Sequence, residues 1–163
     1  MRLFTFFIDK RELGPARVTV GEAEAFWVEI PFGSEYSAPV PSPVLEGEIP
    51  DGPTVEIPLR KLAFARSGDK GNASNVALIA REPRFLPRLR RELTPERLVA
   101  HLGHLVRGPA QRFEAPGLNA LNFLIQDALG GGGMASLRID PQGKAYGQMA
   151  LEMTIAAPRS WVA

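Results

Sequence analysis

Residues 62–80 read LAFARSGDKGNASNVALIA, and this stretch decides the fold. The polar decapeptide Arg66–Asn75 concentrates charge, amide and glycine between an apolar start and the apolar run Val76–Ala80. We expect a strand through Leu59–Ala65, a polar connection, and then a second strand that is buried on both faces. Loops that follow buried strands carry binding and catalytic residues disproportionately often, so the decapeptide is the first candidate site.

The segment after the second strand predicts two helices and a short strand. Leucines recur every three or four residues over 86–93, which indicates one short helix. Thr94 followed by Pro95 is typical of a helix N-terminus, and Gly108–Pro109 predicts the end of that second helix. Gln111–Glu114 then has the composition of a brief strand.

Residues 118–155 predict a third helix and a final hairpin. Over Leu118–Leu129 the large aliphatic residues share one helical face. Ser136–Asp140 and Lys144–Ile155 flank the turn signal Pro141–Gly143, and the second of these segments alternates apolar with polar residues. The order of elements indicates an α+β fold, a ferredoxin-like sandwich whose mixed or antiparallel sheet has its helices packed on one face.

The N-terminal third has a different composition. Eight of the fifteen prolines fall in the first 58 residues, and Pro39–Pro43 marks a linker. Short strand candidates at 17–20 and 26–30 predict a small hairpin there. We therefore expect an N-terminal β arm with a Pro-rich linker over 1–57, a domain over 58–156 and a C-terminal tail over 157–163. The aromatic residues of so short an arm need burial by a second copy of the chain, so we expect a homo-oligomer.

Composition excludes several classes of function. Nineteen basic and eighteen acidic residues leave a formal net charge of +1, so no global field favours nucleic acid or an anionic membrane. Cysteine is absent, which removes disulfides, thiolate metal sites and cysteine nucleophiles. No apolar run approaches the ~18 residues that a membrane span needs. We expect a soluble, cytoplasmic protein with no nucleic-acid or membrane partner.

The decapeptide has the chemistry of an anion site. Its cationic side chains could hold a phosphate or carboxylate, and its glycines allow a ligand to approach the backbone closely. The spacing of a nucleotide-binding P-loop is missing. The alternative is a tight connection in which Asp69, Asn72 and Asn75 cap turns while the cations are solvated. The candidate binding residues here are Arg66, Ser67, Gly68, Asp69, Lys70, Gly71, Asn72 and Asn75.

Two further segments are candidates for the same site. The loop Gly130, Gly131, Gly132 and Gly133 follows the expected third helix, so it is either a mobile connector or a place where another group approaches the backbone. Asn119 and Asn122 share one edge of that helix with Gln126, where their amides could bind a ligand or simply be exposed to solvent. We expect the decapeptide, this amide edge and the glycine loop to converge at one end of the sheet.

The remaining polar residues give no catalytic or metal motif. His101 and His104 are three residues apart on a helix but have no clear third ligand, so we expect neither a metal nor a cofactor. No Gly-x-Ser-x-Gly elbow is present, which argues against a nucleophilic hydrolase. The weak catalytic candidates are Asp69 and Lys70, and the sequence leaves open whether the protein is an enzyme.

Four sequence blocks together resemble the C-terminal domain of the acyclic terpene utilisation protein A (AtuA)-like family. They are Leu62–Asn72 with Asn75, Gly103–Val106, Pro116–Phe123, and Ala128–Gly133 continued to Ala145. The resemblance covers roughly residues 58–156 and implies a ferredoxin-like domain that follows a larger N-terminal domain or stands alone beside genes of acyl-CoA and terpenoid breakdown. The family often has Asp where this chain has Asn72, which removes one carboxylate.

The resemblance brings no established reaction, so three functions stay open. The first is an accessory or interaction domain of acyl-CoA or terpenoid catabolism that recognises a partner protein or an anionic small molecule through Arg66–Asn75. Its partner would include the larger AtuA-like N-terminal domain as a separate subunit. The second is a catalytic subunit that acts on an acyl-CoA-like substrate, with Asp69 as acid or base. The third is a structural oligomerisation domain that uses the N-terminal arm.

Overall fold

The computed structural model describes residues 6–29, 31, 33, 35–37, 40 and 47–161. The chain divides into two compact units, Met1–Pro41 and Ser42–Ala163. The predicted linker Pro39–Pro43 lies largely outside the described residues. In the first unit a short 3-10 helix η1 (Lys10–Glu12) precedes an antiparallel hairpin of β1 (Ala16–Val18) and β2 (Phe26–Val28). This hairpin was predicted from the sequence, and none of the described residues of the unit is buried.

A four-stranded antiparallel sheet forms the frame of the second unit. Its strands are β4 (Ala63–Lys70), β5 (Ala73–Ala80), β6 (Ala110–Ala115) and β7 (Ala120–Ile125), in the spatial order β4-β5-β7-β6. The β4 and β6 strands are therefore the edges. The apolar β5 and β7 strands lie in the centre, as expected for strands that hydrogen bond on both sides.

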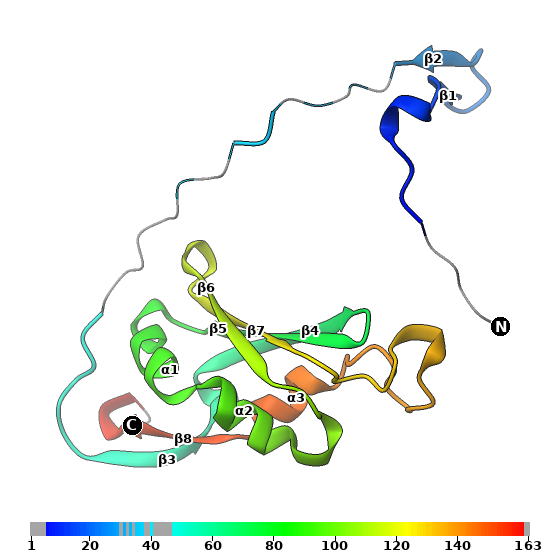
Figure 1. The fold of residues 1–163 in the computed structure, drawn as a ribbon. Coiled ribbons are helices and arrows are strands. Elements are labelled where there is room, and N and C mark those ends of the chain that lie inside the picture. The colour runs from blue at the N-terminus through cyan, green and yellow to red at the C-terminus, as the bar shows by residue number, and fades with distance from the viewer. Residues whose placement is uncertain are drawn as a thin grey trace. The chain divides into compact units, whose positions relative to one another are not determined.

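One face of this sheet is covered by all three helices and by a separate β-ribbon (Figure 1). The helices are α1 (Leu86–Glu92), α2 (Pro95–Leu102) and α3 (Tyr146–Leu151), and the ribbon pairs β3 (Thr54–Pro58) with β8 (Thr154–Pro158). Thr94 caps α2 by accepting a hydrogen bond from the Arg97 N–H, as its sequence position predicts. The predicted α+β ferredoxin-like class, with helices on one face of the sheet, is confirmed.

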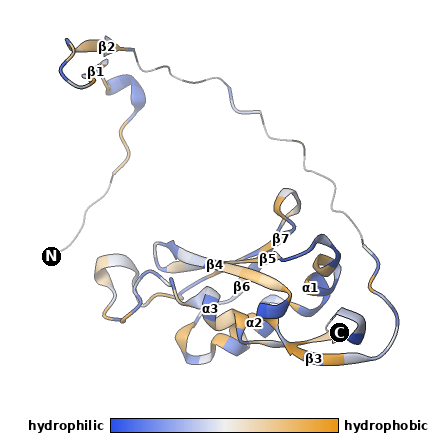
Figure 2. Ribbon diagram, turned by 180° about the vertical axis from the view of Figure 1, so that it is seen from behind, coloured by the Kyte–Doolittle hydropathy of each residue, from blue (hydrophilic) through white to orange (hydrophobic). Residues whose placement is uncertain are grey.

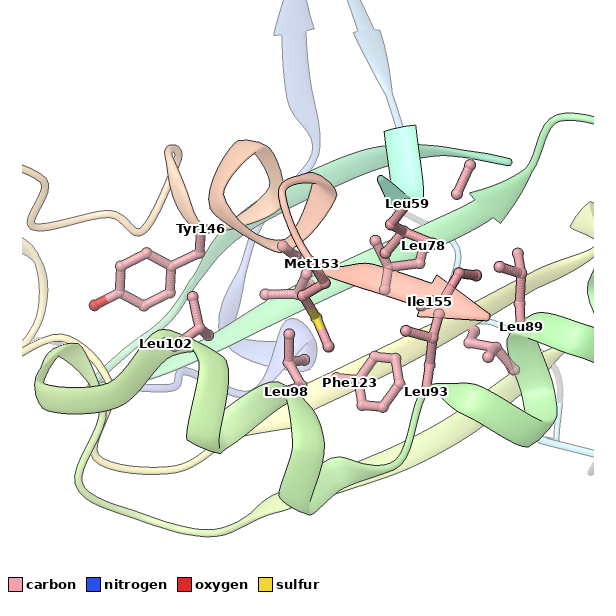
Figure 3. Packing of buried hydrophobic residues seen from close by; sticks show 14 of the residues in the cluster. Leu59, Leu78, Leu89, Leu93, Leu98, Leu102, Phe123, Tyr146, Met153 and Ile155 are labelled. Atoms are coloured by element: carbon pink, nitrogen blue, oxygen red, sulfur yellow. The ribbon is translucent and has the colours of Figure 1, made fainter. Parts of the chain in front are cut away.

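The core lies between the sheet and this covering layer (Figure 3). Leu78 and Phe123 point inward from β5 and β7 and are fully buried. They meet Leu98 of α2, Leu89 of α1 and Ile155 of β8 in one hydrophobic cluster. Figure 2 shows strong hydrophobic colour on the β3–β8 ribbon and hydrophilic colour on parts of the helices. Burial of this cluster is the main favourable term that fixes the ends of β4 and β5.

The decapeptide differs from the predicted connection. Residues 63–70 form one continuous strand, and only Gly71 and Asn72 form the turn to β5. Gly71 has φ of 66°, a left-handed conformation that glycine adopts without steric cost. Lys70 pairs directly with Ala73, so a two-residue hairpin turn is enough to reverse the chain. Arg66–Lys70 of the decapeptide therefore lie on the edge strand β4, Asn72 lies in the turn, and Ser74 and Asn75 lie on the central strand β5.

The predicted helix Leu118–Leu129 is wrong. Residues 120–125 form the central strand β7, and the glycine loop follows this strand instead of a helix. A period of two explains the burial, because Leu121, Phe123 and Ile125 are all fully buried while Leu118 is 68% exposed. The aliphatic residues of this segment fit both the helical period of about 3.6 residues and the strand period of two. Pairing with both β5 and β6 selects the strand.

The predicted final hairpin is also wrong. Ser136–Asp140 contains no strand, and Lys144–Ile155 contains the helix α3 and only the start of β8. Tyr146 and Ala150 are one helical turn apart and both buried, whereas Met149 is 39% exposed. The β8 strand pairs with β3, which lies about one hundred residues earlier in the sequence. A short-range turn signal could not indicate so distant a partner.

Candidate functional site

The β4–β5 turn is held against the segment that follows β7. The Asn72 main-chain oxygen accepts hydrogen bonds from the N–H groups of Ala128 (2.9 Å) and Leu129 (3.1 Å). The Asn72 side chain donates from Nδ2 to Asp127 Oδ1 at 2.9 Å and accepts at Oδ1 from the Gly131 N–H at 2.7 Å. The turn and the glycine loop therefore form one structure, and Asn72 has mainly a structural role in it.

The four glycines differ in what surrounds them. A Cβ atom on Gly132 would overlap the Gly71 carbonyl oxygen, so close approach of two backbones explains this glycine. A Cβ atom on Gly130 would lie 3.1 Å from Arg138 Nε, whereas Gly133 faces open space. The glycine loop could be a mobile connector or a place where another group approaches the backbone. At Gly132 another group does approach, and that group is the β4–β5 turn.

A polar pocket of about 380 Å³ lies at the edge of the sheet beside β4. Alternation along the strand places Arg66, Gly68 and Lys70 on the face of the sheet that carries no helices. Asn75 of β5 pairs with Gly68 and lies beside them. The lining is completed by Ser67, Asp69 and a residue that the sequence analysis did not select, Lys144.

Lys144 reaches the pocket from the loop before α3. Its Nζ atom lies 3.9 Å from Asp69 Oδ1, and it lies so close to Gly68 that a Cβ atom there would be 3.1 Å away. Its main-chain N–H donates to Asp140 Oδ1 at 2.9 Å, which fixes the loop. In the sequence, only the family resemblance points to Lys144, because Asp140–Ala145 belongs to one of its blocks. No local pattern marks a loop lysine that reaches a strand so distant in the sequence.

Buried hydroxyl groups fix this arrangement. Ser67 Oγ donates to the Lys144 carbonyl oxygen at 3.0 Å and accepts from the Gly147 N–H at 2.8 Å. Ser74 Oγ donates to the Gly68 carbonyl oxygen at 3.0 Å. Ser67 therefore joins β4 to the start of α3, and its hydroxyl is occupied by protein partners. In the site, Ser67 therefore supports the loop that carries Lys144.

The pocket has an excess of positive charge. Arg66, Lys70 and Lys144 line the pocket with a single carboxylate, Asp69, whose side chain is 36% exposed. Lys70 Nζ donates to the Asp69 main-chain oxygen at 3.2 Å, and the Arg66 guanidinium forms no ion pair with any residue in the described part of the chain. Three cations against one carboxylate favour an anion, and their local field is strongest at low ionic strength.

The two asparagines of the expected amide edge have different partners along β5. Asn122 of β7 accepts a hydrogen bond from Asn75 Nδ2 at 3.4 Å, so it lies behind the pocket. Asn119 precedes β7 and accepts the Ala80 N–H at the opposite end of β5. There it lines a different pocket with Gly47 and Pro83. The decapeptide contacts Asn122 through Asn75 and the glycine loop through Asn72, but neither Asn122 nor Gly130–Gly133 lines the cationic pocket.

The described residues contain no group of three or more histidine, aspartate or glutamate side chains placed to hold a metal ion. His101 Nε2 lies 2.8 Å from the Met149 carbonyl oxygen, so this ring already has a protein partner. Among the same residues, no helix is long and apolar enough to span a membrane.

The fold and the pocket together define a small α+β ferredoxin-like domain with a cationic site at one sheet edge. A family model described as the AtuA ferredoxin-like domain matches residues 57–156, more than half of the chain. The protein belongs to this family, as the sequence blocks indicated. Searches among curated proteins and among solved structures found no match.

Proposed function

We propose that residues 58–156 are an accessory, ligand-binding domain of an AtuA-like system and that the pocket beside β4 recognises an anionic small molecule. One observation carries this proposal: three cationic side chains from two distant segments line one polar pocket of about 380 Å³. The pocket contains only one carboxylate to offset them. Lysine and arginine in this arrangement suit a phosphate or carboxylate group.

The setting in acyl-CoA or terpenoid catabolism is part of the proposal and comes from the family resemblance. It makes a coenzyme A thioester one candidate ligand, because coenzyme A carries several phosphate groups. The larger AtuA-like N-terminal domain, in a separate chain, is the partner that the same resemblance implies. The ligand class and this partner can be tested separately.

Calorimetric titration with inorganic pyrophosphate and with coenzyme A tests the ligand class. Lys144→Gln should weaken pyrophosphate binding about tenfold or more, because a hydrogen bond to a charged group contributes about 1.5–3 kcal/mol. Lys61→Gln is the matched control, since Lys61 is exposed and lies outside the pocket. Equal affinity in the wild-type protein and both variants would exclude this pocket as the anion site.

Asp69→Asn distinguishes binding from catalysis. In a binding site the single carboxylate repels an anion, so its removal should strengthen pyrophosphate binding several-fold. A general acid or base at Asp69 would instead be essential for turnover of an acyl-CoA-like substrate. The 36% exposure of this side chain favours binding, because catalytic carboxylates are usually sheltered from water. Loss of a measurable turnover in Asp69→Asn with unchanged pyrophosphate affinity would favour the catalytic alternative.

A further inference from the structure

A further cavity, larger than the cationic pocket, shares no lining residue with that pocket, although its lining residues Asp140 and Ala145 adjoin Lys144. Its volume is about 570 Å³, within the roughly 300–1,000 Å³ of small-molecule sites. Three segments supply the walls: the 3-10 helix η4 (Gly103–Leu105), the loop 137–140 and α3. The main lining residues are His104, Leu105, Leu137, Ile139, Tyr146 and Met149. No feature of the sequence analysis predicted this cavity.

Aliphatic side chains at this cavity are exposed to water. Leu137 and Ile139 are fully exposed, at 103% and 105%, and Met149 is 39% exposed. Leu137 and Ile139 belong to one loop that is fixed next to α3 by the Asp140 carboxylate, which accepts the Ala145 N–H at 2.8 Å. Covering these side chains would remove apolar surface from water, which is favourable in proportion to the area covered.

The charged and phenolic groups at the cavity already have protein partners. Arg138 Nη1 donates to the Tyr146 hydroxyl at 3.0 Å and to the main-chain oxygens of Leu105 and Ala128. The Tyr146 hydroxyl lies 2.7 Å from the Ala128 oxygen. Burial raises the pKa of Tyr146 above its ordinary value of 10.0, so the ring is neutral in the physiological range. The cavity therefore offers no unopposed charge to an ionic ligand.

His104 is the exception among the lining residues. Its ring forms no hydrogen bond within the part of the chain that the structure describes, and it stands exposed at one wall. An imidazole can accept or donate one hydrogen bond. A ligand that fits would be apolar over most of its length and carry one polar group for His104.

We propose that this cavity binds an aliphatic chain with a hydroxyl or similar neutral end group, independently of the anion pocket. The chain would lie against Leu137, Ile139 and Met149, and its polar end would contact His104. A concave site of this volume suits a small molecule better than a flat protein surface does. A second copy of the protein seated on Leu137 and Ile139 is the competing occupant, and the experiment separates the two.

A series of straight-chain alcohols tests the proposal on the full-length protein. We expect affinities for hexan-1-ol, octan-1-ol and decan-1-ol, measured by calorimetry or saturation-transfer NMR, to rise about fourfold for each added methylene. This factor corresponds to transfer of the methylene from water into an apolar site, at about 0.8 kcal/mol. Affinities that do not depend on chain length would overturn the proposal.

Matched surface variants locate the site. Leu137→Asp and Ile139→Asp should each weaken decanol binding about tenfold or more without lowering the melting temperature, since both side chains are fully exposed. Leu118→Asp is the control, because Leu118 is 68% exposed and lies outside the cavity. Equal losses in all three variants would overturn the assignment. So would unchanged decanol affinity in Leu137→Asp together with a change of oligomeric state in light scattering, which would identify a contact between copies.

Discussion

Two of the local β-hairpins in the described residues, β1–β2 and β4–β5, have very different support. The β1–β2 hairpin pairs only three residues per strand, and none of its described residues is buried. The β4–β5 hairpin pairs eight residues per strand, and Leu78 and Val76 of β5 are fully buried. Isolated two-stranded hairpins are marginally stable in water, whereas a third strand and a covering layer make a hairpin part of a core. The same local pattern thus gives structures of unequal stability.

The two turns show the same contrast. The turn of the first hairpin closes on itself through the Ala23 N–H and the Val20 oxygen, at 3.1 Å. The β4–β5 turn is bound from outside by the Asn72 hydrogen bonds to residues 127–131. Anchoring of the turn is what makes β4 a rigid support for the cationic pocket, so changes at the anchor test the comparison directly.

Gly132→Ala should have the largest effect on the anchored hairpin. The new Cβ atom would overlap the Gly71 carbonyl oxygen, so either the turn or the glycine loop must move. We expect a loss of about 3 kcal/mol in the free energy of unfolding, as for other overpacked sites with left-handed backbone strain, measured by urea denaturation.

Gly133→Ala is the matched control for this variant. Gly133 also has a positive φ, 47°, but nothing lies within 4 Å of the Cβ position. Backbone strain alone should cost about 1–2 kcal/mol there. If both variants lose the same stability, contact between the turn and the loop is not what Gly132 provides, and the hairpin is not anchored in this way.

Asn72→Asp should have a smaller effect on the same anchor. It removes the Nδ2 donor and places a carboxylate beside Asp127, whose Oδ1 accepts that hydrogen bond at 2.9 Å. Both groups are exposed, so we expect a loss of about 1–2 kcal/mol at pH 7. The stability should recover in the double variant Asn72→Asp/Asp127→Asn, which restores the pair with exchanged roles. Additive losses in the double variant would show that the two side chains do not interact.

Much of the fold was predictable where local patterns agree with the tertiary structure. The Thr94–Pro95 signal gave the start of α2, and the apolar run after Asn75 gave β5, because capping and strand burial act over a few residues. Leu118–Leu129 was predicted as a helix because its aliphatic residues fit the helical period, although they fit the period of a strand as well. Only the neighbours β5 and β6 decide between them, and these lie outside any sequence window.

The candidate site was predictable in part for the same reason. The density of charge between two strands located the pocket on Arg66–Lys70, although these residues form a strand edge and not a loop. Lys144 was missed because its approach to Gly68 depends on packing of α3 against β4 through Ser67. Asn119 does not line the cationic pocket, because residues 119 and 122 would share one edge of a helix but do not share a face where β7 forms.

Deletion of residues 1–41 should have the smallest effect of all. Among the described residues of 1–41 none is buried, so the deletion removes no core residue from the described part of the chain. It also removes Trp27, which is 66% exposed, and leaves Trp161, whose ring centroid lies 4.9 Å from that of Phe85, as the reporter. We expect the urea midpoint from Trp161 fluorescence to match that of the full chain at low protein concentration. A lower midpoint would show that the weakly supported hairpin contributes to the folded domain. Light scattering on both forms tests the expected homo-oligomer, which requires the full chain to associate more strongly than the shortened one.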